Sequence, residues 1–128
     1  MSVLDQVRDN LKASHSSLRC TEAAGTIIVH ALTPGGFDVS ISEELIVGYN
    51  GWHEQFSTPE EALECFAFGF SDRCRLRVHY CGRRAYKWTV ESLEDGRWVE
   101  GSTTGLIFIP FWRSRRIEYR QNSPLKGG

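Results

Sequence analysis

Two adjacent residues, His53 and Glu54, are of the types most often used for acid–base chemistry, and they closely follow Asn50-Gly51. Asn-Gly is typical of a two-residue hairpin turn, so the next strand is expected to hold both side chains. Neighbouring residues in a strand point to opposite faces, and His53 and Glu54 therefore cannot orient each other. If they do chemistry, each must act with other partners.

The turn at Asn50-Gly51 is expected to pair Tyr49 with Trp52, so that Glu54 shares a face with aromatic residues. Burial among rings would raise the pKa of the Glu54 carboxyl and suit it to act as a general acid or base. At an open sheet edge, Glu54 would instead be an ordinary solvated carboxylate. His53 and Glu54 therefore mark an alternative site, a pocket for a small molecule or for the substrate of an enzyme.

No other part of the sequence carries a recognisable catalytic motif. A nucleophile elbow, a phosphate-cradling loop, a dinucleotide fingerprint and a zinc-protease helix are all absent from the sequence. We therefore expect a non-catalytic protein, and we assign it no catalytic residue and no cofactor.

The four cysteines, at positions 20, 65, 74 and 81, contain no C-x-x-C pair. Cys74 and Cys81 are seven residues apart in one predicted strand and therefore face opposite sides of the sheet. Only Cys65 and Cys74, on either side of a helix-to-strand turn, could approach each other. We expect free thiols in a reducing compartment and no metal site.

The strongest candidate for a binding surface is rich in arginine and aromatic residues. Residues 110–116 (PFWRSRR) combine two aromatic side chains with three arginines, and alternate positions of an earlier predicted strand add more bases. Trp and Arg are the residues that most often anchor interfaces. The proposed surface consists of Trp112, Arg113, Arg115, Arg116, Arg120, Arg75, Arg77 and Lys87.

An acidic segment of a protein partner is the expected occupant of this surface. Single-stranded nucleic acid is an alternative, because bases could stack on the rings while arginines contact phosphates. A further alternative is that the arginines pair within the chain with Glu91, Glu118 and the acidic first half. In that case the rings would cap the core.

Charge is unevenly distributed along the 128 residues, although the net charge is only −1. Residues 1–70 hold three bases and ten acids, a net charge of −7, whereas residues 71–128 hold twelve bases and six acids, a net charge of +6. The two halves could neutralise each other across a sheet or a subunit interface, or the basic half could attract an anionic partner.

Two helices are predicted from the spacing of apolar residues. The first covers residues 3–11. The second starts at Thr58-Pro59, where an N-cap, a proline at the first helical position and Glu61 form a capping box. Its expected buried stripe is Ala62, Leu63, Phe66, Ala67 and Phe70, with Phe68 off the stripe.

Most of the remaining chain is predicted to be strand, at 26–32, 37–41, 45–49, 52–56, 73–81, 86–91, 106–111 and 116–120. Residues 13–25 read as a connector. A three- or five-residue loop is expected to pair Tyr80 with Tyr86, Val78 with Trp88 and Leu76 with Val90, and Asp95-Gly96 to form a further hairpin with a bulge.

These elements predict an α+β fold of antiparallel β-meander sheets with one well-capped central helix and an N-terminal helix. We expect a single domain over residues 1–121 and a flexible tail over 122–128. No apolar stretch is long enough to span a bilayer, and the first ten residues lack a signal-peptide core. We therefore expect a small soluble cytoplasmic protein, in which a homodimer could cover open strand edges.

Overall fold

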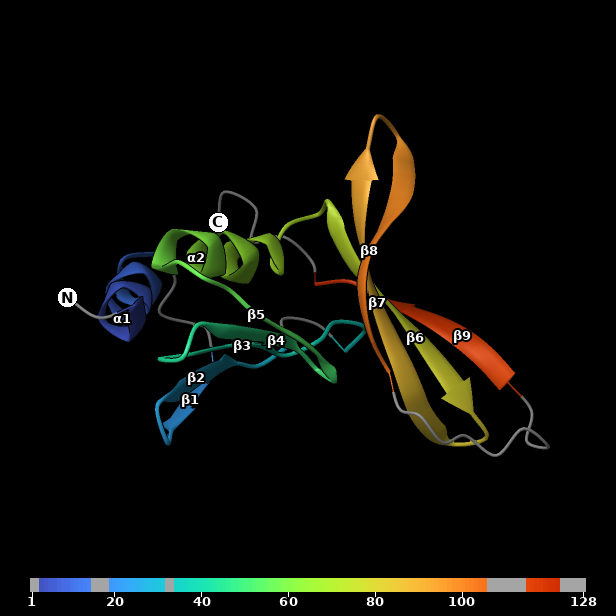
Figure 1. The fold of residues 1–128 in the computed structure, drawn as a ribbon, viewed down its shortest axis with the longest axis horizontal. Helices are drawn as coiled ribbons and strands as arrows, with labels where there is room; N and C mark the ends of the chain where they lie inside the picture. The colour runs from blue at the N-terminus through green and yellow to red at the C-terminus, as the bar shows by residue number, and fades with distance from the viewer. Residues whose placement is uncertain (1–2, 15–18, 32–33, 106–114, 123–128) are drawn as a thin grey trace.

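The computed structural model describes residues 3–14, 19–31, 34–105 and 115–122. Within these ranges it contains two helices and two antiparallel sheets, which confirms the expected α+β class (Figure 1). The elements are α1 (Val3–Ser14), β1 (Cys20–Ala23), β2 (Thr26–Val29), β3 (Val39–Ser42), β4 (Ile46–Tyr49), β5 (Trp52–Gln55), α2 (Pro59–Phe68), β6 (Cys74–Cys81), β7 (Arg84–Glu94), β8 (Arg97–Gly105) and β9 (Arg115–Arg120).

Sheet A is a five-stranded meander in the order β1-β2-β3-β4-β5. Period-two alternation in β3 buries Val39 and Ile41 and leaves the intervening serines partly exposed. The strand β1 was not predicted, because the exposed sequence of Cys20–Ala23 has no apolar period and owes its conformation to pairing with β2. The helices α1 and α2 pack with this sheet in one core (Figure 1).

The capping box predicted for α2 is confirmed. The Thr58 hydroxyl accepts the backbone N–H of Glu61 at 3.2 Å and lies 3.0 Å from the Glu61 carboxylate, while Pro59 occupies the first turn. Ala62 and Phe66 are buried as expected, whereas Ala67 is exposed and the off-stripe Phe68 is half-buried. The helix therefore packs on a narrower stripe than its sequence suggests.

Sheet B has the strand order β8-β7-β6-β9 and extends away from the helices (Figure 1). The expected three- or five-residue loop between β6 and β7 is wrong, because Cys81 pairs with Arg84 and leaves a two-residue turn. A bulge follows that turn, so Tyr80 pairs with Ala85 and not with Tyr86. The bulge supplies the extra residue that the longer loop was expected to supply, and it restores the predicted apolar pairs.

The restored pairs are Val78 with Trp88 and Leu76 with Val90, as predicted. The Asp95-Gly96 turn is also confirmed, with positive φ angles of 51° and 78° and a register shift further along the same hairpin. The strand expected at 106–111 lies outside the described residues.

The last strand, β9, pairs with β6 and not with the strand before it in the sequence. Asn122, just beyond β9, is fully buried, although we expected it to begin a tail. Its side-chain amide donates to the backbone carbonyls of Phe37 and Gly69, both at 3.1 Å, and its carbonyl accepts the Phe37 N–H. These bonds join the end of sheet B to the C-terminus of α2.

The two sheets meet at the hairpin between β4 and β5. Its predicted register is confirmed, since Tyr49 pairs with Trp52 and Val47 with Glu54. Asn50 has the positive φ expected for the turn, at 52°, but Gly51 does not. Gly51 is needed for another reason: a Cβ atom there would overlap the ring of Trp88 from β7.

Candidate functional site

One face of sheet B points away from the core, and we call it the outer face. By strand register, its members are Arg75, Arg77 and His79 on β6, Arg84, Lys87, Thr89, Glu91 and Leu93 on β7, Trp98, Glu100 and Thr103 on β8, and Arg115, Ile117 and Tyr119 on β9. The opposite face carries Leu76 and Val78 into the core. The expected alternation is therefore present, with basic side chains on one side and apolar side chains on the other.

Arg75 lies at the centre of the outer face between two aromatic rings. Its guanidinium carbon is 4.3 Å from the centroid of Trp98 and 4.0 Å from that of Tyr119. Its Nε donates to the Glu91 carboxylate at 2.6 Å. Stacking and pairing together fix the guanidinium plane, because each partner restricts a different direction.

Glu91 is the acidic centre of this cluster, and its side chain is only 3% exposed. It also pairs with Arg77 at 2.8 Å, and Arg77 pairs in turn with Glu100. The hydrogen bond to Glu100 raises the pKa of Arg77 and lowers the pKa of Glu100. Both arginines are therefore committed to carboxylates within the chain, as one of our alternatives expected.

His79 lies beside this network. Its Nε2 accepts a hydrogen bond from Nε of Arg77 at 3.2 Å, which requires that nitrogen to be unprotonated. Burial lowers the pKa of His79, and the charges of Lys87 and Arg77 lower it further. His79 is therefore neutral near pH 7.

The structure brings together only part of the surface predicted from the sequence. Arg75, Arg77 and Lys87 share the outer face, and Arg115 lies at its end opposite Cys81. Arg116 and Arg120 lie on the opposite face, because they pair with Tyr80 and Leu76. Trp112 and Arg113 fall outside the described residues.

The face that carries Arg116 and Arg120 has its own partners. Arg116 stacks on Tyr80 at 4.3 Å and donates to Glu118 at 2.9 Å. Arg120 contacts the same carboxylate at 3.5 Å. The expected continuity from Arg116 and Arg120 to Arg75 is therefore wrong, since the register of β9 on β6 turns their side chains away.

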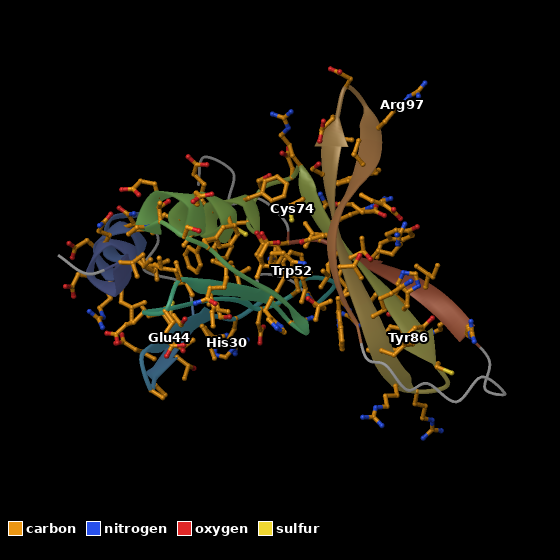
Figure 2. All side chains as sticks on the ribbon, viewed as in Figure 1. His30, Glu44, Trp52, Cys74, Tyr86 and Arg97 are labelled. Carbon is orange, nitrogen blue, oxygen red and sulfur yellow. The ribbon has the colours of Figure 1, made fainter. Side chains whose placement is uncertain are left out.

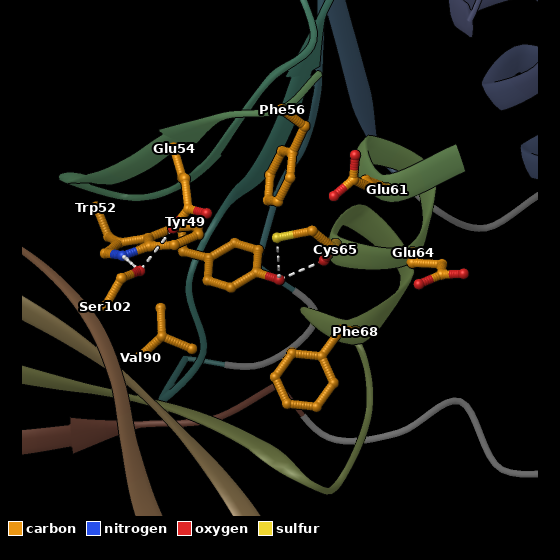
Figure 3. Close-up of a pocket in the computed structure, with 10 residues that line it drawn as sticks. All are labelled: Tyr49, Trp52, Glu54, Phe56, Glu61, Glu64, Cys65, Phe68, Val90 and Ser102. Atoms are coloured by element: carbon orange, nitrogen blue, oxygen red, sulfur yellow. Dashed lines mark hydrogen bonds between the residues drawn. The ribbon is translucent and has the colours of Figure 1, made fainter. Parts of the chain in front are cut away.

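The alternative site is a pocket of about 520 Å³ between β5, α2 and sheet B (Figure 3). Glu54 lines it, as the sequence suggested, but His53 is exposed elsewhere. His53 instead exchanges two backbone hydrogen bonds with the Thr104 hydroxyl, both at 3.2 Å. The pocket is lined by Tyr49, Trp52, Glu54, Phe56, Glu61, Glu64, Cys65, Phe68, Val90 and Ser102.

A chain of hydrogen bonds orients Glu54 at the pocket. The Trp52 indole N–H donates to the Ser102 hydroxyl at 3.0 Å, and that hydroxyl donates to Glu54 at 2.8 Å. The relay links sheet A to sheet B, because Trp52 and Glu54 belong to β5 and Ser102 to β8 (Figure 3).

Tyr49 and Cys65 occupy the inner wall of the pocket. The Tyr49 hydroxyl donates to the Cys65 carbonyl and lies 3.3 Å from the Cys65 sulfur. Burial raises the pKa of Tyr49 and raises that of Cys65 to about 11. Both groups are therefore protonated at neutral pH, and neither is poised as a nucleophile or a base.

Burial keeps the thiols of Cys65 and Cys74 protonated at neutral pH. All four cysteines are free thiols, and burial also raises the pKa of Cys74 to about 12. Across the described ranges, no three His, Cys, Asp or Glu side chains are grouped closely enough to hold a metal ion. Neither helix in these ranges has the length and apolarity needed to cross a bilayer.

Sequence reasoning missed Trp98 on the outer face and Ser102 at the pocket. Both lie on β8, whose pairing with β7 is interrupted by a bulge. Because a bulge changes which face the later side chains take, the faces of Trp98 and Ser102 could not be predicted from their spacing. The Asp95-Gly96 turn and the large aromatic residue Trp98 just after it were the available signals, but the position of the bulge could not be predicted from the sequence.

Comparison of the chain with protein-family models, with curated proteins and with solved structures finds no match. Any functional conclusion therefore rests on the geometry of this chain alone.

Proposed function

We propose that this chain is a small non-catalytic binding protein and that its outer face docks an acidic segment of a protein partner. One observation carries the proposal: the Arg75 guanidinium is held between the rings of Trp98 and Tyr119, on the same sheet face as Arg77 and Lys87. The apolar flank of this platform is exposed, with Ile117 at 50% and Tyr119 at 52%.

Charge and composition support an anionic partner. By register, the outer face carries five fixed cations, Arg75, Arg77, Arg84, Lys87 and Arg115, against the two carboxylates of Glu91 and Glu100. The excess of three positive charges favours association with an acidic segment. Trp, Tyr and Arg are the residues that most often anchor interfaces, and stacking on two rings holds Arg75 in place before a partner binds.

Single-stranded nucleic acid is the weaker proposal for this face. Two carboxylates lie within the face and would repel a phosphate backbone. An acidic peptide can place its charges over Lys87 while leaving Glu91 and Glu100 uncontacted. Oligothymidylate therefore serves as a comparison ligand.

The test is a fluorescence-anisotropy titration with a synthetic peptide of alternating Glu and Leu. We expect Lys87→Glu to weaken binding at least about tenfold, because it reverses a cation on the outer face. Arg97→Glu makes the same charge change at the exposed tip of the β7–β8 hairpin (Figure 2) and should leave the affinity within about twofold of wild type.

Equal effects of Lys87→Glu and Arg97→Glu would mean that the peptide responds only to the net charge of the protein and not to the outer face, and would overturn the proposal. Tighter binding of oligothymidylate than of the acidic peptide would overturn the proposal in favour of a nucleic-acid ligand for the outer face.

The aromatic pocket supports a second candidate function, binding of a small molecule. Its volume of about 520 Å³ lies in the range typical of ligand sites, and its polar groups converge on one carboxylate.

For location we propose the cytoplasm, since free thiols such as Cys65 and Cys74 persist in a reducing compartment. A homodimer through the outer face would be detected as a two-fold mass in sedimentation.

A further inference from the structure

The pocket has aromatic walls contributed by three elements. Tyr49 comes from β4, Trp52 from β5 and Phe68 from α2, and Phe56 lies between β5 and α2 (Figure 3). The faces of aromatic rings carry partial negative charge and attract organic cations. These walls therefore favour a ligand with an apolar body and, where charged, a positive head.

The charged residues of the pocket all have the same sign. Glu54 comes from β5, and Glu61 and Glu64 come from α2, while none of the described residues that line the pocket is a Lys, Arg or His. In the part of the chain that the structure describes, none of these three carboxylates forms an ion pair. An anionic ligand would be repelled, whereas a cationic ligand would supply the opposite charge.

Glu54 is the carboxylate best placed to meet such a ligand. One of its oxygens accepts from Ser102, which holds the carboxylate in position, and the other has no hydrogen-bond partner among the described residues. The Glu54 charge also adds to the rise in pKa of both Tyr49 and Cys65, so its field reaches the inner wall.

The outer face of the same molecule shows how these components combine. There, the Arg75 guanidinium stacks on two rings and pairs with the Glu91 carboxylate. The pocket has aromatic rings and a carboxylate like those around Arg75, but none of the described residues that line it is basic.

We propose that the pocket between β5, α2 and sheet B binds a small organic cation, an ammonium or guanidinium group on an aromatic or alkyl body. The cationic head lies beside Glu54 and the body lies against Trp52 and Phe68. This inference rests on the second candidate function and is independent of the outer face.

The test uses phenethylammonium as the probe and phenethyl alcohol as its neutral analogue. Binding is followed by the NMR shift of the Trp52 indole N–H, which belongs to the relay that holds Glu54. For the wild-type protein we expect the ammonium to bind at least about tenfold more tightly than the alcohol. Equal affinities would overturn the proposal without requiring any variant.

Variants then locate the charge. Glu54→Gln keeps the acceptor for Ser102 and removes the charge, so it should reduce the preference for the ammonium at least about fivefold. Glu60→Gln removes one charge from α2 outside the pocket and should change the preference less than about twofold. If Glu54→Gln fails to fold, Glu64→Gln, at an exposed position, replaces it.

A loss of preference as large in Glu60→Gln as in Glu54→Gln would also overturn the proposal. The acidic-peptide titration distinguishes this outcome from a failure of the outer face, because Glu54→Gln leaves every outer-face residue unchanged.

Discussion

Glu91 is the residue on which the outer face most depends. It is almost fully buried and pairs with both Arg75 and Arg77. Its removal would leave two partly buried guanidiniums without their shared carboxylate, and such losses cost more than the pair itself contributes. The stacking of Arg75 on Trp98 and Tyr119 would then lose its anchor.

We therefore expect Glu91→Gln to lower the free energy of unfolding by about 2 kcal/mol. The matched control is Glu94→Gln on the same strand, where the carboxylate is exposed, and its effect should stay within about 0.5 kcal/mol. Chemical denaturation of both variants measures the difference. Equal effects would mean that the Glu91 cluster adds nothing to stability.

His79 makes stability depend on pH. Because the pKa of His79 is lowered in the folded protein, the unfolded chain takes up its proton at a higher pH. Stability is therefore lost as the pH falls through the ordinary histidine pKa of about 6.5. His79→Gln keeps an acceptor for Arg77 and removes the titration.

We expect His79→Gln to lose less stability than wild type between pH 7.5 and pH 5.5 in denaturant melts. His53→Gln removes an exposed imidazole and should follow wild type. A His79→Gln variant that loses as much stability as wild type would contradict this assignment.

At the scale of elements, the two residues of the β4–β5 turn are required for different reasons, one for its backbone conformation and one for its lack of a side chain. Asn50 takes the left-handed conformation, while Gly51 makes room for Trp88. We expect Gly51→Ala to destabilise the protein by about 2 kcal/mol, since the ring must move out of a packed junction. Gly35→Ala, where an added Cβ meets nothing within 4 Å, is the control in a thermal melt. A Gly51→Ala variant as stable as Gly35→Ala would show that the Trp88 ring can move without cost, and would contradict this reading of the junction.

Local signals predicted the elements that local chemistry determines. The α2 capping box at Thr58 and the alternation of Arg75 and Arg77 with Leu76 depend only on nearby residues, and both are confirmed. The side of the sheet taken by Arg116 depends on which strand β9 joins and in which register, and that choice is made by tertiary pairing. Its placement could not be predicted from spacing within β9.

The pocket was predictable only in part for the same reason. The Asn50-Gly51 turn placed Glu54 among aromatic residues, and Glu54 does line the pocket. Ser102 reaches Glu54 only because β8 crosses β5, a contact between residues that are 48 positions apart. The spacing of residues along the chain carries no information about such a crossing.

On the scale of the whole molecule, the charged residues of each candidate site come from a different half of the sequence. All the pocket carboxylates come from the acidic first half, and all the outer-face cations come from the basic second half. Several ion pairs, including those of Arg8 with Glu22 and of Arg75 with Glu91, join residues within one half. The account therefore assigns ligands of opposite charge to the two sites.

Ser102 connects these parts, because it bonds Trp52 and Glu54 across the junction of the sheets. We expect Ser102→Ala to cost about 1 kcal/mol in denaturant melts, since it leaves the half-buried Trp52–Glu54 relay incomplete. Ser92→Ala, whose hydroxyl bonds the exposed Glu94, should cost less than about 0.5 kcal/mol. An equal cost for the two variants would exclude a role for the relay in joining the sheets.

The outer face is tested most directly by mapping the acidic peptide onto the protein with backbone and indole NMR shifts. The account predicts that the largest shifts fall on Arg77, Lys87, Tyr119 and the Trp98 indole, and that they shrink as salt is raised. Shifts concentrated on α2 or on sheet A, with the outer face unchanged, would contradict it.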